Sequence, residues 1–76
     1  MDKQEIAHIL KNEIATTERT INKLQLLQSQ IVDSHQARDI GDTIQELVTH
    51  KQKLETIIEQ NNEDARSYNR PSSFGL

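Results

Sequence analysis

The stretch QIVDSHQA, residues 30–37, decides the fold, because the apolar pattern of the chain reverses within it. On either side of Ser34, apolar residues recur at alternating spacings of three and four, which is typical of a coiled-coil seam. Each seam position before Ser34 has a counterpart at the same distance after it. This mirror symmetry predicts an all-α fold, an antiparallel two-helix hairpin. The seam positions are Ala7, Leu10, Ile14, Thr17, Ile21, Leu24, Gln28 and Ile31 in the first arm and Ala37, Ile40, Ile44, Leu47, Lys51, Leu54, Ile58 and Asn61 in the second.

The large aliphatic seam residues form the predicted core of the hairpin. They lie on both arms, so that each arm would bury its row against the other. These core residues are Leu10, Ile14, Ile21, Leu24, Ile31, Ile40, Ile44, Leu47, Leu54 and Ile58.

Helix-forming residues without proline fill both arms, so we expect helices over residues 3–32 and from the turn to about residue 63. From Asp64 onward the composition changes, and Pro71 cannot continue a helix. The chain therefore divides into a hairpin, residues 1–64, and an extended or disordered tail, residues 65–76.

The turn is expected at Asp33 and Ser34, because either residue can cap the second helix by accepting hydrogen bonds from its free amides. Asp33 followed by Gln36 resembles a capping box, and Val32 is placed to pack on Ala37 as a hydrophobic staple.

Polar and small residues interrupt the pattern at defined places. Thr17 faces Lys51 across the seam, and Gln28 occupies a seam position near the turn. Such residues cost stability but disfavour other alignments of the helices. In the mirrored register Gly41 lies opposite Leu27, which suggests that the glycine makes room for the leucine.

The small apolar content predicts that the hairpin needs a partner. Of 76 residues only 33% are hydrophobic, and the absence of cysteine excludes disulfides as staples. Further apolar residues widen the stripe beyond what a single helix pair covers. A homodimer forming a four-helix bundle would bury them, and a heteromeric complex with other helices would satisfy them equally. These flanking residues are Ile6, Leu27, Val32, Val48 and Ile57.

No motif in the sequence predicts catalysis. We find no nucleophile beside a base, no glycine-rich phosphate loop and no metal-ligand spacing, so we expect a non-enzymatic protein without cofactor or metal. Asp39, Asp42 and Glu46 form an acidic group that is expected on a solvated helix face. His50 is expected to pair with Glu18 on the flank of the seam.

Neither a signal peptide nor an apolar run of the roughly 20 residues that span a membrane is visible, which predicts a soluble, cytoplasmic protein. The net charge of −3 gives no general attraction to nucleic acid.

The tail contains both aromatic residues of the chain together with two arginines, which are typical anchors of interfaces. One interpretation is a short motif that docks into a partner. The other is that the aromatic residues fold back over the open end of the bundle, or that the tail is disordered. The candidate partner-binding residues are Arg66, Tyr68, Arg70 and Phe74.

The opening MDKQE, residues 1–5, and the stretch VDSHQARDI, residues 32–40, are similar to segments of the Rop family of plasmid RNA-binding proteins, which the length and turn also resemble. The resemblance implies a dimeric four-helix bundle that binds RNA. That family uses an aromatic and polar-basic set on its first helix, whereas the first arm here has no aromatic residue. The basic residues of the first arm are Lys3, Lys11, Arg19 and Lys23.

The stretch QARDIGD, residues 36–42, is similar to the acidic hairpin tip of Gre-type transcription factors. That resemblance implies a coiled coil inserted into RNA polymerase, with Asp33 or Asp42 at its exposed end. Length, acidity and the lack of cysteine also resemble small helical-hairpin chaperones of type III secretion systems.

Taken together, the residues favour a non-catalytic interaction module, a small adaptor, chaperone or regulator that binds itself and another protein. RNA binding of Rop type and polymerase regulation are the alternatives.

Overall fold

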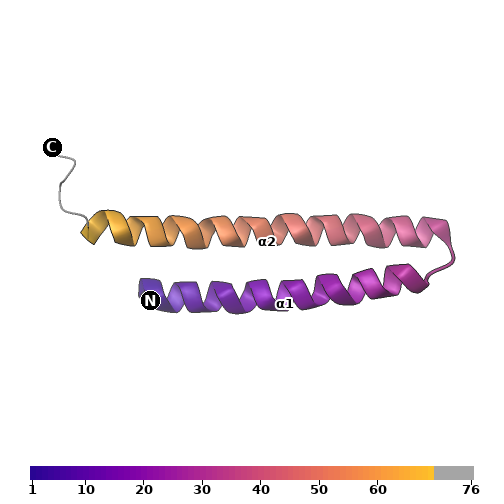
Figure 1. Cartoon of the computed structure of the whole chain (residues 1–76), viewed down its shortest axis with the longest axis horizontal. Helices are drawn as coiled ribbons and strands as arrows, with labels where there is room; N and C mark the ends of the chain where they lie inside the picture. The colour runs from indigo at the N-terminus through magenta and orange to yellow at the C-terminus, as the bar shows by residue number, and fades with distance from the viewer. Residues whose placement is uncertain (70–76) are drawn as a thin grey trace.

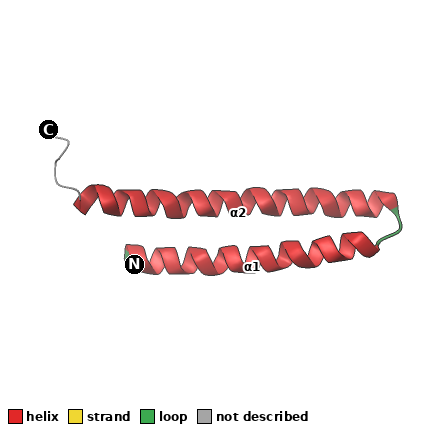
Figure 2. Cartoon of the chain, viewed as in Figure 1, coloured by secondary structure: helices red, strands yellow, loops and turns green. Residues whose placement is uncertain are grey.

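The fold is a hairpin of two antiparallel helices, as the mirrored seam predicts (Figures 1 and 2). In this computed structural model the backbone of residues 1–69 and the side chains of residues 1–62 are described. Helix α1 spans Lys3–Gln30 and helix α2 spans Ser34–Asn69. Between residues 1 and 69 there is no strand, and neither helix has a segment long and apolar enough to cross a membrane.

Helix α1 begins at a complete capping box. The backbone N–H of Glu5 donates to Asp2 Oδ1 at 2.8 Å, and the N–H of Asp2 donates to Glu5 Oε1 at 3.2 Å. The helix ends at Gln30, two residues before the predicted end, because Ile31 already has an extended backbone with ψ of 129°. The connection between the helices is therefore residues 31–33, slightly earlier in the chain than expected.

Asp33 caps helix α2. Its Oδ1 accepts hydrogen bonds from the backbone N–H groups of His35 at 2.8 Å and Gln36 at 3.0 Å. The alternative cap, Ser34, is instead the first residue of the helix. The predicted staple is wrong, because Val32 is 97% exposed and its side chain is left in the solvent rather than on Ala37.

Helix α2 continues beyond its predicted end near residue 63 and stops at Asn69, two residues before Pro71. Residues 65–69, which we assigned to the tail, are therefore helical. Since α2 is longer than α1, its last turns run past the N-terminus of α1 (Figure 1). The remainder of the predicted tail, residues 70–76, lies outside the described residues.

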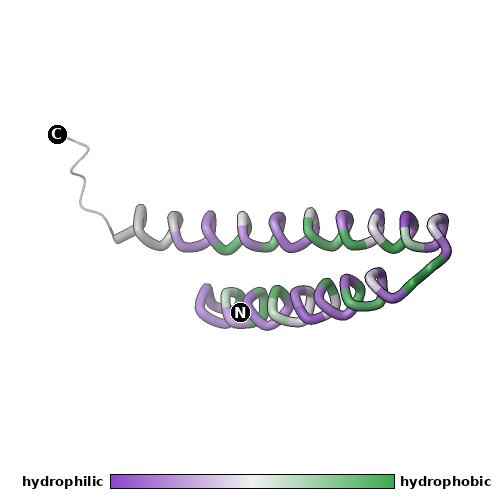
Figure 3. The backbone as a smooth tube through the Cα atoms, turned by 45° about the vertical axis from the view of Figure 1, so that its right-hand side comes forward, coloured by the Kyte–Doolittle hydropathy of each residue, from purple (hydrophilic) through white to green (hydrophobic). Residues whose placement is uncertain are grey.

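The contact between the helices follows the predicted seam. All sixteen seam positions are buried or half-buried, and among residues 1–62 only Ile6, Gly41 and Val48 join them in that class. Hydrophobic segments accordingly recur along both arms (Figure 3). Yet the packing is thin, because only Ile21 and Ile44 are buried apolar residues within this range, at 7% and 9% exposure.

Gln28 explains the glycine inside helix α2. Its amide nitrogen Nε2 donates to the carbonyl oxygen of Ala37 at 3.0 Å, and a Cβ atom added at Gly41 would lie 2.9 Å from that nitrogen. Our expectation that Gly41 accommodates Leu27 is therefore wrong. Leu27 is 45% exposed, and no atom of it lies within 4 Å of a Cβ placed at Gly41.

A second polar contact joins the helices at the open end of the hairpin, where Asn61 Nδ2 donates to the carbonyl oxygen of Lys3 at 3.1 Å. Between the two ends, the buried hydroxyl of Thr17 is satisfied within its own helix by the carbonyl of Glu13 at 2.9 Å. Polar seam residues thus bond the arms at both ends, which disfavours sliding of one helix along the other.

The cap at the turn predicts a stability difference between two neighbouring substitutions. Asp33→Ala should lower the free energy of unfolding by about 1 kcal/mol, because two helix amides lose their acceptor. Ser34→Ala is the control and should change it by less than about 0.5 kcal/mol. Urea unfolding followed by circular dichroism at one protein concentration measures both. Equal effects of the two substitutions would contradict the assignment of the cap.

The Gln28–Gly41 contact predicts a coupling between two further substitutions. In a Gln28→Ala background, Gly41→Ala should stabilise the protein by about 1 kcal/mol through helix propensity. In the natural background the gain should be smaller, since the new Cβ displaces the Gln28 amide from its acceptor. A double-mutant cycle by urea unfolding measures the difference. Identical gains in both backgrounds would show that the contact is absent.

Candidate docking face

The seam divides the surface of the hairpin into two broad faces. The two antiparallel arms are related by a local two-fold axis that is perpendicular to the plane containing both helices. Equivalent heptad positions of the two arms therefore lie on the same face of the hairpin. Residues directly before the first seam position of each heptad lie on one face, together with the residues two positions after it. Residues directly after the second seam position lie on the other face, together with the residues directly after the first seam position.

The first of these faces carries most of the exposed large aliphatic side chains, and we call it the apolar face, defined by Ile6, Ile9, Leu27 and Ile57. Ile9 is 52% exposed, and Leu27 and Ile57 are each 45% exposed. Leu26, at 62% exposure, differs from them, because its heptad position points away from α2 at the outer edge of α1. The apolar face therefore holds side chains that the hairpin alone leaves unburied.

The opposite face is mostly hydrophilic, and we call it the polar face, defined by Lys11, Glu18, Gln25, Val48 and Glu55. Its one large aliphatic member within the helices, Val48, is already half-buried. Val32, which follows the seam residue Ile31, lies in the connection between the helices and is exposed. The stripe that we predicted to be wide on both sides is thus wide on one side only. The sequence analysis missed Ile9, although it follows Ile6 at helical spacing. Separating the flanks of the seam into two faces would have identified it.

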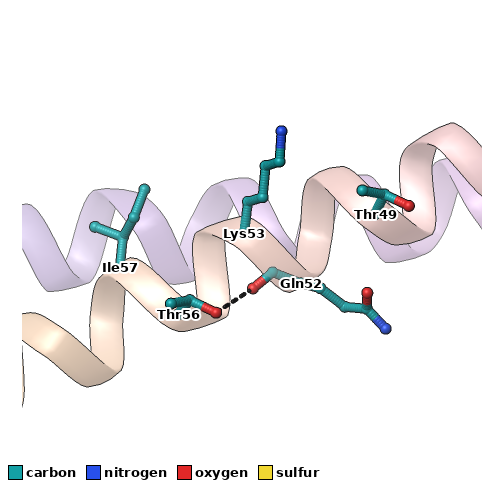
Figure 4. Close-up of a pocket in the computed structure, with 5 residues that line it drawn as sticks. All are labelled: Thr49, Gln52, Lys53, Thr56 and Ile57. Atoms are coloured by element: carbon teal, nitrogen blue, oxygen red, sulfur yellow. Dashed lines mark hydrogen bonds between the residues drawn. The ribbon is translucent and has the colours of Figure 1, made fainter.

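The close-up of helix α2 shows the two faces directly (Figure 4). Lys53 and Ile57 point to one side of the helix, and Gln52 points to the other. The five labelled residues surround a hollow of about 400 Å³. All of them belong to α2, so the hollow is a depression on the surface of one helix rather than a cleft between elements.

The acidic group near the turn lies on the exposed surface of helix α2. The carboxylate of Asp39 lies 3.8 Å from His35 Nε2, and both side chains are well exposed, at 65% and 80%. Asp42 and Glu46 are exposed as well and line another depression of α2 alone, of about 370 Å³. Within the described residues, no three His, Asp or Glu side chains are grouped so that they could hold a metal ion.

Two further predictions concern the Glu18–His50 pair and the aromatic residues of the tail. Glu18 and His50 lie on opposite broad faces, and in the described part of the chain no hydrogen bond or ion pair joins them, so the predicted pair is wrong. Arg66 and Tyr68 belong to helix α2, but their side chains are not among those described. Arg70 and Phe74 lie outside the described residues, so the aromatic motif stays a prediction.

Comparison with known proteins gives no relative for this chain. It matches no protein-family model, and no curated sequence and no solved structure is significantly similar to it. The similarities to the Rop family, to Gre-type factors and to secretion chaperones therefore rest only on the short stretches, the length, the turn and the composition named above.

Proposed function

We propose that this protein is a non-catalytic interaction module that self-associates through its apolar face to form a four-helix bundle. In that role it would serve as a small adaptor, chaperone or regulator. The main support is the imbalance between buried and exposed apolar side chains.

Few apolar side chains are buried within one hairpin. Ile21 and Ile44 are the buried apolar residues, and no side chain of residues 1–62 is fully buried. A domain of this size gains too little from such a core to offset the entropy of ordering its chain. Docking a second helix layer would remove the exposed aliphatic side chains from water at about 25 cal/mol for each Å² buried.

A four-helix bundle fits the distribution of the half-buried residues. Seam side chains such as Leu10, Leu24 and Leu54 are covered by the opposite arm but remain partly accessible. A second hairpin placed on the apolar face would cover them from the remaining side, as in bundles whose core is shared by four helices. A docked layer would therefore complete the core that each hairpin begins.

The alternatives have less support from the described residues. The basic residues of α1 do not form a stripe for RNA, because Lys11 lies on the polar face, Lys23 on the apolar side and Arg19 at the outer edge. Of the two acids that the polymerase alternative would use, Asp33 already accepts two backbone hydrogen bonds through Oδ1, and Asp42 lies inside helix α2 rather than at its exposed end.

Measurement of the mass in solution, combined with a pull-down with and without nuclease, tests the proposal. We expect a dimer at micromolar concentration and retention of a protein partner after nuclease treatment. Capture of RNA that nuclease abolishes, with binding that weakens steeply with salt, would favour the RNA alternative instead. A monomer at all concentrations would contradict self-association.

Two adjacent leucines provide a matched pair of variants. Leu27→Gln, on the apolar face, should raise the dimer dissociation constant about tenfold or more, since each dimer would bury two copies of the side chain. Leu26→Gln makes the same chemical change at the outer edge of the same helix and should leave the constant within about twofold. Analytical ultracentrifugation over a concentration series measures both. A larger effect at Leu26 would place the interface elsewhere.

A further inference from the structure

We infer that the partner on the apolar face is a second copy of this chain, aligned by four charged side chains that make the face complementary to itself. The inference rests on the proposed self-association and adds the surface and the residues that direct it. The four residues are Glu13 and Lys23 on α1 and Glu46 and Lys53 on α2. All four are exposed, so they are accessible to a docked layer.

The four charges occupy the corners of a rectangle on the apolar face. In the mirrored register Lys53 lies within two residues of the level of Glu13, toward the open end of the hairpin. Glu46 lies within one residue of the level of Lys23, toward the turn. Each level thus carries one acid and one base, and each arm carries the two signs in the opposite order.

This alternation has a geometric consequence. Two arrangements of a two-fold dimer are possible, and in both the axis lies in the plane of the apolar face. If the axis runs parallel to the helices, Glu13 lies opposite Lys53 of the second copy and Lys23 lies opposite its Glu46. If the axis runs perpendicular to the helices, Glu13 lies opposite Lys23 of the second copy and Lys53 lies opposite its Glu46. Opposite signs meet at every corner in both cases, as in closed two-fold dimers whose interface pairs a surface with itself.

The exposed aliphatic side chains of the face lie outside these corners. Ile9 and Ile57 lie toward the open end, and Leu27 lies toward the turn, so a second copy would cover apolar surface at both ends. Thr16 and Thr20, small exposed side chains, occupy the middle of α1. The four charges therefore lie between two apolar ends of the face, and a second copy would cover both ends.

The size of the face also fits a dimer. Helices about 10 Å wide and an α1 length of about 42 Å give the two-helix layer an area of roughly 800 Å². A stable protein–protein interface typically buries about 800 Å² on each partner. A single added helix would cover only about half of this surface, whereas a second hairpin covers it completely.

The polar face lacks this arrangement. Its charges include Lys11 and Glu55 near the open end, but toward the turn α1 presents Gln25 and only α2 presents a charge, Arg38. No half-turn pairs all of these charges with opposite signs. The apolar face carries one further acid, Asp39, which meets no charge of the second copy in either half-turn. The difference between the faces is therefore the set of four corner charges, which the polar face lacks.

A charge-reversal exchange tests the inference. One variant combines Glu13→Lys with Glu46→Lys, and the other combines Lys23→Glu with Lys53→Glu. Each variant alone should dissociate at least 100-fold more readily than the natural protein, because like charges would meet at the corners. An equimolar mixture in 0.15 M salt should restore a dimer that contains one chain of each variant, detected by native mass spectrometry. If one of the variants is unfolded by itself and has lost its helical circular dichroism signal, recovery of that signal on mixing the two variants also supports the inference.

A control variant carries the same change in net charge on the polar face, Glu18→Lys with Glu55→Lys. It should keep the natural dissociation constant within about threefold and should not pair preferentially with the Lys23→Glu, Lys53→Glu variant. If the natural protein dimerises but the control is the variant that dissociates, the choice of face is wrong while self-association stands. Lone variants that dimerise normally, or a mixture that fails to pair, also overturn the inference. A natural protein that never dimerises contradicts the proposed function itself.

Discussion

Two helices lying side by side can cover each other only along one line, and this limit governs the whole structure. The line here is the seam, and even its most protected residues, Thr17, Ile21 and Ile44, keep between 5% and 9% of their surface. Apolar side chains one position off the line stay in water, as Ile57 does. Because one partner helix covers only one line of its neighbour, the hairpin buries its seam and leaves the flanking apolar side chains in contact with water.

The register of the two arms is fixed by polar groups rather than by the apolar residues alone. Aliphatic rows can slide by a heptad at little cost, whereas a hydrogen bond between named atoms cannot. The Asp33 cap sets where α2 begins, the Gln28 amide reaches Ala37 near the turn, and Asn61 bonds Lys3 at the other end. These contacts place the acids and bases of α1 and α2 at matching levels.

The sequence could predict the hairpin because spacing alone identifies a seam, and spacing needs no knowledge of distant contacts. The reversal near Ser34 and the alternation from Leu10 to Ile58 were sufficient. Side-chain detail was less accessible. Gly41 faces Gln28 rather than Leu27, because the long Gln28 side chain reaches the carbonyl oxygen of Ala37. The spacing of apolar residues gives no information about such a polar contact. Val32 lies in the solvent because α1 ends earlier than its composition suggested.

The candidate site was predictable only in part, for a related reason. A stripe of flanking residues was evident in the sequence, but assigning each residue to one side of the hairpin requires the antiparallel geometry. Only with that geometry do Leu27 of α1 and Ile57 of α2 share a face, and only then do Glu18 and His50 lie on different faces. The four corner charges carried no signal as a motif, since two lie on each arm and their relation exists only across the seam.

The central claim is that each hairpin is stabilised by a second copy, and the dependence of thermal stability on protein concentration tests it most directly. When folding and association are coupled, the midpoint of unfolding rises with concentration by mass action. Circular dichroism melts across a hundredfold range of concentration should show a midpoint that increases by several degrees. A midpoint that stays constant over that range, with the protein fully helical throughout, would show that one hairpin is stable alone.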